Sequence, residues 1–195
     1  MSTTELEAQA LVAPPAGDWE IDAGHSDVTF TARYMMLTKV RGRFGTHVGT
    51  IHIGQGLDDS WAEVTIDATS IDTNHPQRDQ HLRSPDFLHV EGFPTLKFRS
   101  AKLEQTGPAT LRVTGDLTIK DVTKPVVLDV EYQGYAPRDL MGKSRIAFVA
   151  KTEIDREDFG ITWNQALETG GVLVGKKVGI ELEVQAVGPA AEAAA

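Results

Sequence analysis

The chain has 195 residues, of which 41% are hydrophobic, and this is enough for one globular domain with its own core. Its formal net charge of −9 disfavours nucleic acid and anionic bilayers as partners, because binding to either depends on Lys and Arg side chains that neutralise negative charge. The absence of cysteine excludes disulfides, thiolate nucleophiles and cysteine-ligated zinc.

The first residues, MSTTELEAQALVAPPAGDW, contain early acids and lack the basic and apolar regions of a secretory signal, so we expect a cytoplasmic protein. No window approaches the roughly 18 consecutive apolar residues of a membrane span, so we expect no stable membrane insertion. The composition predicts disordered tails at residues 1–17 and 189–195 around one domain at 18–188.

Alternating apolar and polar residues, typical of half-buried β-strands, dominate the domain. The pattern first appears in DVTFTARY, where Val28, Phe30, Ala32 and Tyr34 share one face. In the next run, KVRGRFGTHVGTIHI, the apolar phase shifts, which predicts a bulge at Gly45 or Gly49. Further alternating runs follow at residues 62–69, 95–100, 110–119, 125–132, 145–154 and 178–186, and turn residues predict turns at 54–59, 105–108, 124–125 and 134–142.

One segment, TNHPQRDQHLRSPDF (residues 73–87), has helical features instead. Pro76 suits a first helical turn, and Thr73 or Asn74 could cap it. We expect this insert to be a lid or rim element with its charges in water, its few apolar residues facing inward, and an ion pair between Asp79 and Arg83.

The titratable residues of the insert do not have the spacing of a metal site. His75 and Asp79 share a helix face, but His81 points to another side, so the three cannot converge on one ion. Other motifs also fail. GGVLVGKK lacks the Ser or Thr and the following helix of a phosphate-binding loop, and neither G-x-S-x-G nor H-E-x-x-H occurs in the chain.

The fold class that follows is all-β with a short helical insert. Long antiparallel strands with one polar face must bury the other face against a second sheet or by closing on themselves. A sandwich leaves no tunnel, whereas a barrel of about eight strands can hold one small ligand. The mixture of Val, Ala and Phe on the inward faces favours a barrel with a partly empty lumen.

Two further clusters have two interpretations each. Lys39, Arg41 and Arg43 lie on one strand face, where they form either a solvated exterior or a contact for a diphosphate headgroup or acidic partner. Tyr34 and Met36, with the methionine between them, either fill the core or adapt to an irregular apolar ligand.

Six blocks in the same order and spacing resemble the YceI-like polyisoprenoid-binding family: HSDVTFTARYMMLTKVRGRF, SIDTNHPQRDQHLRSPDF, FPTLKF, VTGDLTIKDVTKPV, DREDFGITWN and GGVLVGKKVGIELEVQA. The resemblance covers about residues 19–186. It implies an extended, antiparallel, lipocalin-like β-barrel whose apolar tunnel holds an isoprenoid chain, such as the tail of a quinone or polyprenyl phosphate. The implied function is non-catalytic binding, storage or transport, with no cofactor beyond the bound lipid.

The alternation and the resemblance together give the candidate ligand contacts Val28, Phe30, Ala32, Tyr34, Met36, Phe44, Val64, Ile66, Leu82, Phe87, Phe98, Leu117, Leu128, Phe148, Trp163 and Ile180. Arg41, Arg43 and His81 are candidate headgroup contacts. One alternative is a lipocalin-like enzyme acting on a bound lipid or small aromatic molecule, with Tyr34, His81 or Asp79 as acid or base. Another is a stress-linked interaction protein with a filled lumen. Whether the protein forms a homodimer stays open.

Overall fold

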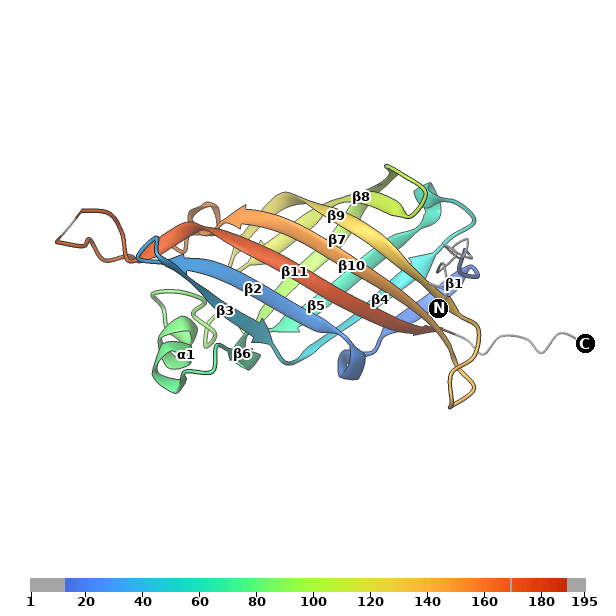
Figure 1. Cartoon of the computed structure of the whole chain (residues 1–195), viewed down its shortest axis with the longest axis horizontal. Helices are drawn as coiled ribbons and strands as arrows, with labels where there is room; N and C mark the ends of the chain where they lie inside the picture. Colours follow the sequence, from blue (N-terminus) through green and yellow to red (C-terminus); the bar gives the residue numbers. More distant parts are fainter. Residues whose placement is uncertain (1–12, 169, 189–195) are drawn as a thin grey trace, which may run out of the picture.

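The structure is a computed structural model that describes residues 13–168 and 170–188. It is a closed antiparallel β-barrel with one short α-helix outside its wall (Figure 1). The elements are β1 (Gly17–Ile21), β2 (Asp27–Tyr34), β3 (Thr38–Phe44), β4 (His47–Ile53), β5 (Trp61–Asp67), β6 (Ile71–Asp72), α1 (Pro76–Arg83), β7 (Thr95–Gln105), β8 (Thr110–Ile119), β9 (Val122–Ala136), β10 (Ser144–Asp155) and β11 (Val174–Gly188). The 3-10 turns are η1 (Ala23–His25), η2 (Leu57–Asp59), η3 (Ala68–Ser70) and η4 (Arg156–Phe159).

The ring closes through β1, which pairs with β4 on one side and with the end of β11 on the other. Eight strands complete the circle in the order β1-β4-β5-β7-β8-β9-β10-β11, and the remaining strands extend the wall from β11 in the order β2-β3-β6. This confirms the extended eight-stranded antiparallel barrel and excludes the sandwich.

Two interruptions give the barrel its extended shape. The turn η1 separates β1 from β2, and residues 45–46 separate β3 from β4. Because of the second interruption, β3 pairs with β2 and β6, whereas β4 pairs with β1 and β5. The structure therefore has a break between two strands at residues 45–46 in place of the predicted bulge, and the N–H of Gly45 donates to the carbonyl of Ser70 at 3.2 Å.

The expectation of a turn at residues 124–125 is wrong. Pro125 lies inside β9, opposite Asp116 of β8, and the reversal occurs at Lys120, which has a φ of 59°. Proline is tolerated there because β10 begins to pair with β9 only from Asp129, so at Pro125 the strand has β8 as its one neighbour. The predicted turn at 134–142 also starts too early, since β9 continues to Ala136 with a register shift near Gly134.

The helical insert is confirmed, but two of its predicted contacts are wrong. The Nδ1 atom of His75 accepts the N–H of Arg78, so His75 caps α1 in place of Thr73 or Asn74. Asp79 is buried and accepts hydrogen bonds from Thr73. It therefore does not pair with Arg83, whose guanidinium donates to two backbone carbonyls, those of Thr69 and Ile71.

The core is divided along the barrel axis. A large buried cluster includes Val28, Ile66 and Leu117, and a smaller one surrounds Trp19, which is fully buried near the β1–β11 closure. Of the two predicted tails, residues 1–12 and 189–195 lie outside the described residues, and β1 begins at Gly17. Within the described part of the chain, no helix has the length and apolarity needed to cross a bilayer.

Candidate functional site

The inner wall of the barrel is built from side chains that lie opposite one another on neighbouring strands. Directly opposed residues of an antiparallel pair project from the same face. Phe30 of β2 faces Ile180 of β11, and Phe98 of β7 lies between Val64 of β5 and Leu117 of β8. Alternation along each strand therefore gives an apolar lumen and a polar exterior.

Two apolar cavities occupy this lumen. The inner one has a volume of about 210 Å³ and the outer one about 360 Å³. They share six wall residues, Ile21, Val64, Phe98, Leu128, Leu182 and Val184, so they adjoin each other along the barrel. Ligand pockets in proteins commonly measure about 300–1,000 Å³, so the two spaces together suit one ligand of moderate size.

Most of the residues predicted as ligand contacts line these cavities. Those around the inner cavity are Val28, Phe30, Ala32, Phe44, Val64, Ile66, Leu82, Phe87, Phe98, Leu117, Leu128 and Ile180. Phe148 lines the outer cavity, where its ring packs against Tyr132 with centroids 5.3 Å apart. The structure thus brings together side chains from strands β2 to β11 and from the helical insert.

The other predicted residues lie elsewhere. Tyr34 and Met36 are exposed at the β2–β3 turn, by 42% and 57%. Trp163 packs behind the inner cavity, with its indole centroid 4.6 Å from the ring of His81. His81 itself contacts Asp86 at 2.8 Å. Tyr34, His81 and Asp79, the alternative acid and base residues, are therefore not brought to a common site.

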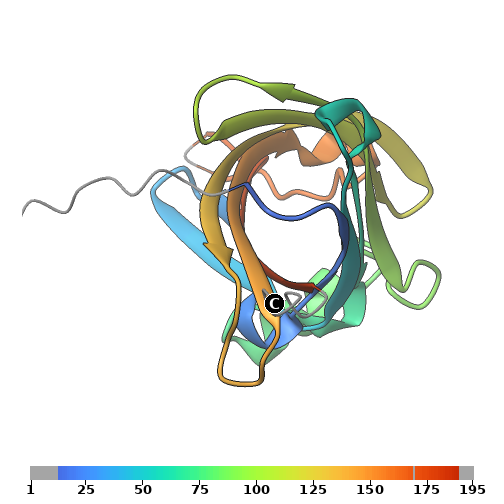
Figure 2. The ribbon, with the colours of Figure 1, turned by 90° about the vertical axis from the view of Figure 1, so that its right-hand side faces the viewer.

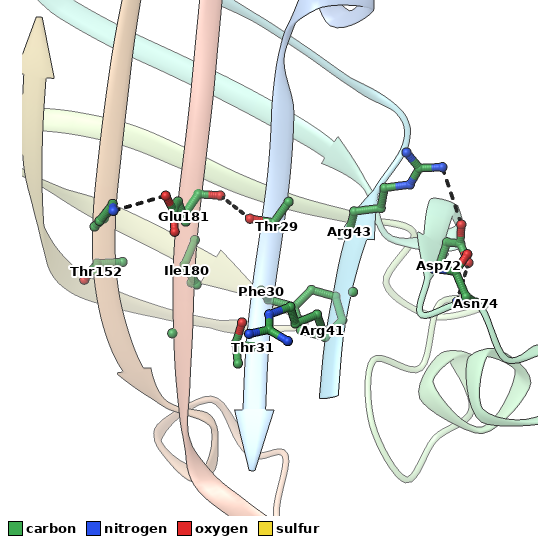
Figure 3. Close-up of a pocket in the computed structure, with 13 residues that line it drawn as sticks. Thr29, Phe30, Thr31, Arg41, Arg43, Asp72, Asn74, Thr152, Ile180 and Glu181 are labelled. Atoms are coloured by element: carbon green, nitrogen blue, oxygen red, sulfur yellow. Dashed lines mark hydrogen bonds and ion pairs between the residues drawn. The ribbon is translucent and has the colours of Figure 1, made fainter. Parts of the chain in front are cut away.

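The cations of β3 lie on the outside of the barrel. Arg41 and Arg43 alternate with Gly42 and Phe44, and Phe44 lines the lumen. Figure 3 shows Arg43 extending toward Asp72, to which it makes a 3.7 Å ion pair. These arginines and Gly179 border a groove of about 500 Å³, which shares Thr29, Phe30, Thr152 and Ile180 with the wall of the inner cavity.

One end of the lumen is closed by the insert and by the β10–β11 connection. Phe87 and Phe159 are buried there. Arg156, 4% exposed, holds the connection by donating to four backbone carbonyls, those of Ile161, Trp163, Val174 and Gly175. Burial lowers the pKa of Arg156. No sequence motif indicates this clamp, because its acceptors are backbone atoms.

The opposite end of the lumen, formed by the outer cavity, reaches partly exposed residues. The outer cavity extends from Phe148 and Tyr132 to Trp61, which is 38% exposed, and to the β7–β8 turn. Figure 2 views the barrel end-on, with the strands arranged around this axis. Burial raises the pKa of Tyr132 to about 12, so the phenol at this end is neutral over the physiological range. We regard this end as the mouth of the lumen.

His47 is a lumenal residue that the sequence prediction missed. It lies opposite Ile66, lines the inner cavity and is 4% exposed. Neither ring nitrogen has a hydrogen-bond partner. Burial lowers the pKa of His47, while the backbone of Phe44 and the carboxylate of Asp27 act in the opposite direction. The available signal was its position two residues before Gly49 on the inward face of the second run.

Metal binding has no visible basis in the part of the chain that the structure describes. There, no group of three or more His, Cys, Asp or Glu side chains is arranged to hold an ion.

Comparison with known proteins gives the family. The model of the YceI-like domain matches residues 19–186. The chain belongs to the YceI-like family. A UPF0312 protein of Staphylococcus epidermidis is 35% identical over 170 residues, which cover 86% of this chain and 95% of the relative. A UPF0312 protein of Vibrio parahaemolyticus is 36% identical over 149 residues, or 75% of this chain and 78% of that protein.

Solved structures share the fold of this YceI-like chain. The YCEI protein of Campylobacter jejuni superposes with a TM-score of 0.68 at 28% identity, covering 80% of this chain and 89% of the other. BcnA of Burkholderia cenocepacia has a TM-score of 0.74 at 20% identity, with coverages of 85% and 98%. A polyisoprenoid binding domain from Saccharophagus degradans has a TM-score of 0.65 at 14% identity, with coverages of 88% and 98%.

Proposed function

We propose that this YceI-like protein binds one isoprenoid lipid in its lumen and stores or transports it without chemical change. The observation that carries the proposal is the pair of adjoining cavities, lined almost wholly by aliphatic and phenyl side chains, which run from the closed end to the mouth. Among classes of ligand, a flexible hydrocarbon chain fits such an elongated apolar space best.

The energetics support a tail-dominated interaction. Burying one CH₂ group contributes about 0.8 kcal/mol, so one five-carbon isoprene unit gains roughly 4 kcal/mol before ordering costs. Strands β9 and β11 have 15 residues each. At about 3.3 Å per residue and a tilt near 40°, they span roughly 40 Å of the barrel axis. Several units therefore fit along the lumen, and a few are enough for tight binding.

Polar groups inside the lumen favour a neutral head. A phosphate would lose its hydration in the apolar cavity, and Arg156 on the wall of the inner cavity already donates to four backbone carbonyls. The unpartnered imidazole of His47 can instead donate to a quinone carbonyl or accept from an alcohol. A polyprenyl phosphate would keep its charged head at the mouth. The polyisoprenoid binding described for the Saccharophagus degradans domain, which has the same fold, agrees with this ligand class.

The test is native mass spectrometry of the protein purified from its own host, compared between an inward and an outward substitution. Phe148→Asp places a carboxylate in the outer cavity and is expected to abolish retention of a prenyl-lipid mass. Val127→Asp, at a residue of β9 that is 45% exposed, is the matched control and is expected to retain it.

Two results would contradict the proposal. One is repeated recovery of wild-type protein with no bound lipid from lipid-containing cells. The other is an unchanged lipid content in a Phe148→Asp variant whose circular dichroism matches that of the wild type.

A further inference from the structure

The β2–β3 turn exposes four consecutive large apolar side chains. Tyr34, Met35, Met36 and Leu37 are 42%, 37%, 57% and 77% exposed. They lie at the end of the barrel that also carries α1 and the β10–β11 connection, where the N–H of Met35 donates to the carbonyl of Leu173 at 2.7 Å (Figure 1). We call residues 34–37 the apolar tip. None of the four lines either lumenal cavity, so the lumen does not account for them.

The backbone of the apolar tip is in a conformation that methionine disfavours. Met35 and Met36 have φ values of 51° and 59°, and the N–H of Leu37 closes the turn on the carbonyl of Tyr34 at 3.0 Å. Positive φ at both central residues is the pattern of type I′ turns, in which Asn and Gly predominate. The sequence therefore retains two strained, exposed methionines where Asn-Gly would relieve the strain, and strain of this kind concentrates at functional positions.

The part of the hairpin nearest the apolar tip carries only positive charge, because the one acid of β2 and β3, Asp27, lies at the opposite end of β2. Residues 28–44 contain Arg33, Lys39, Arg41 and Arg43 and no acid, in a chain whose net charge is −9. Arg33 lies directly opposite Lys39, an arrangement of like charges that destabilises a hairpin. Across the described residues, neither of these two cations has an ion-pair partner. Strain, exposed apolar area and unpaired like charges thus coincide in one hairpin.

We propose that the apolar tip docks the protein on anionic lipid bilayers. The side chains of residues 34–37 enter the boundary between headgroups and acyl chains, while Arg33, Lys39 and Arg41 meet the anionic headgroups behind them. The net charge of the whole molecule argues against this partner, but screening limits electrostatics to about 10 Å, so the local charge of the hairpin decides. The inference goes beyond lipid binding in the lumen, because it assigns a membrane-docking surface to the outside of the barrel, at the end opposite the mouth.

A bilayer fits this surface better than an acidic protein does. A stable protein interface buries about 800 Å² on each partner, and this area is normally a broad, complementary patch. The apolar tip is instead a single projecting turn with its cations set back along the strands. That depth order, apolar residues first and cations next, matches the order of acyl chains and headgroups in a leaflet.

The test is flotation of the full-length protein with vesicles of phosphatidylcholine, with and without phosphatidylglycerol. At about 0.1 M salt, where this screening length holds, the wild type is expected to float with the anionic vesicles and to bind weakly to the neutral ones. Arg33→Gln with Lys39→Gln is expected to weaken binding by about tenfold or more, because each cation near an anionic surface contributes about fivefold. Met35→Asn with Met36→Gly, which suits the turn and so preserves folding, is expected to abolish flotation.

The matched control is the β9–β10 turn at the opposite end of the barrel, where Leu140 and Met141 are 105% and 82% exposed. Leu140→Ser with Met141→Ser is expected to leave flotation unchanged. Equal loss in this control, equal binding of the wild type to neutral vesicles, or no flotation at all would overturn the proposal. So would a concentration-dependent dimer that the Asn-Gly variant dissolves, because the apolar tip would then be a contact between two copies of the chain.

The proposal for the lumen and the proposal for the apolar tip can be refuted independently. In the Asn-Gly variant, lipid content by native mass spectrometry is expected to stay at the wild-type level, while flotation is lost. Flotation of a protein that never holds lipid would refute the lumenal function and leave docking intact. Lipid retention without flotation would refute docking alone.

Discussion

At the scale of single residues, two buried polar side chains show what the interior tolerates. Arg156 donates to four carbonyls, so its burial leaves most of its N–H groups satisfied. His47 is equally buried, yet neither of its nitrogens is paired. An unpaired buried polar group costs free energy because it gives up hydrogen bonds with water. An oxygen atom on a lumenal ligand would therefore gain the most binding free energy by forming a hydrogen bond with His47.

The first residue-scale prediction concerns the pH dependence of stability. Because burial lowers the pKa of His47 from 6.5 in the folded state, the unfolded chain binds a proton at a higher pH than the folded chain does. The contribution of His47 to stability is therefore constant above about pH 6.5 and falls as the pH drops toward the lowered folded pKa. His47→Leu is expected to flatten this decline and to raise the stability of lipid-free protein by about 1–3 kcal/mol.

Urea denaturation of delipidated protein across this pH range measures both effects. Parallel pH profiles for the wild type and His47→Leu would contradict the assignment of His47 as a buried neutral imidazole. A lower stability of the variant at neutral pH would show that the ring is paired in solution.

Alternation predicted individual residues well only inside regular strands. Phe30 and Ile180 were placed on the inward face correctly because each strand projects every second side chain to one side. The same rule fails at Tyr34, the last residue of β2, where the strand reaches the turn and the lumen no longer lies beside it. Arg156 could not be predicted, since its partners are backbone carbonyls up to 19 residues away.

At the scale of elements, the helical insert is held by one polar cluster at its start. Asp79 accepts the N–H of Thr73 at 2.9 Å and its hydroxyl at 2.5 Å. Arg78 donates from Nε to the same hydroxyl at 2.7 Å and from Nη2 to the carbonyl of Thr73 at 2.8 Å. The segment that leads to Leu82 and Phe87, at the closed end of the lumen, thus starts from a fixed position.

Asp79→Ala is expected to loosen this insert. Removing the carboxylate leaves two donors of Thr73 without an acceptor, at a cost of about 1–3 kcal/mol. Amide hydrogen exchange of residues 73–88 is expected to accelerate, while exchange in β8 and β9 stays slow. Asp86→Ala, in which an exposed carboxylate loses its contact with His81, is the control. The same acceleration in both variants would contradict the role given to Asp79.

The helix could be predicted from Pro76 and the polar composition around it, but its contacts could not. The expected pair of Asp79 and Arg83 follows the usual four-residue spacing on an exposed helix face. Here the helix has only eight residues, and the chain before it folds back so that Thr73 reaches Asp79 first. Local sequence rules therefore predicted the helix, whereas the contact with Thr73 determined the partner of Asp79.

At the scale of the whole molecule, Arg145 ties together three parts of the chain near the closure of the ring. It donates to Asp22 at 2.7 Å, to Gln185 at 2.6 Å and to Asp139 at 2.6 Å. These residues belong to the junction after β1, to β11 and to the β9–β10 turn. Arg145 is 21% exposed, so solvent screens these contacts less than those of the surface pairs.

This arrangement predicts the acid stability of the barrel. The Arg145 guanidinium is the main cause that lowers the pKa of Asp22 from 3.8 to about 2. The stabilisation is present above pH 3.8 and is lost as the pH falls through about 2. Arg145→Gln is expected to shift acid unfolding to higher pH, as measured by the fluorescence of the buried Trp19. Arg112→Gln, which removes an exposed pair 3.9 Å long, is expected to leave the midpoint unchanged, and an equal shift in both would contradict the prediction.

The barrel as a class follows from the strands, because their apolar faces had no helices to cover them. The way in which the ring closes does not follow. β1 has five residues and only Trp19 buried among them, so no periodic pattern marks it as the strand that joins β4 to β11. Closure depends on pairings between residues more than 150 positions apart, which local sequence patterns do not encode.

The late position of β11 has a consequence for biosynthesis. During synthesis the first strands of the barrel are made early. The lumen is not enclosed, however, until β11 has been synthesised and has paired with both β1 and β2. A lipid cannot be enclosed while translation is under way. The proposed ligand would therefore have to enter after the barrel is complete, through an opening in its wall or ends.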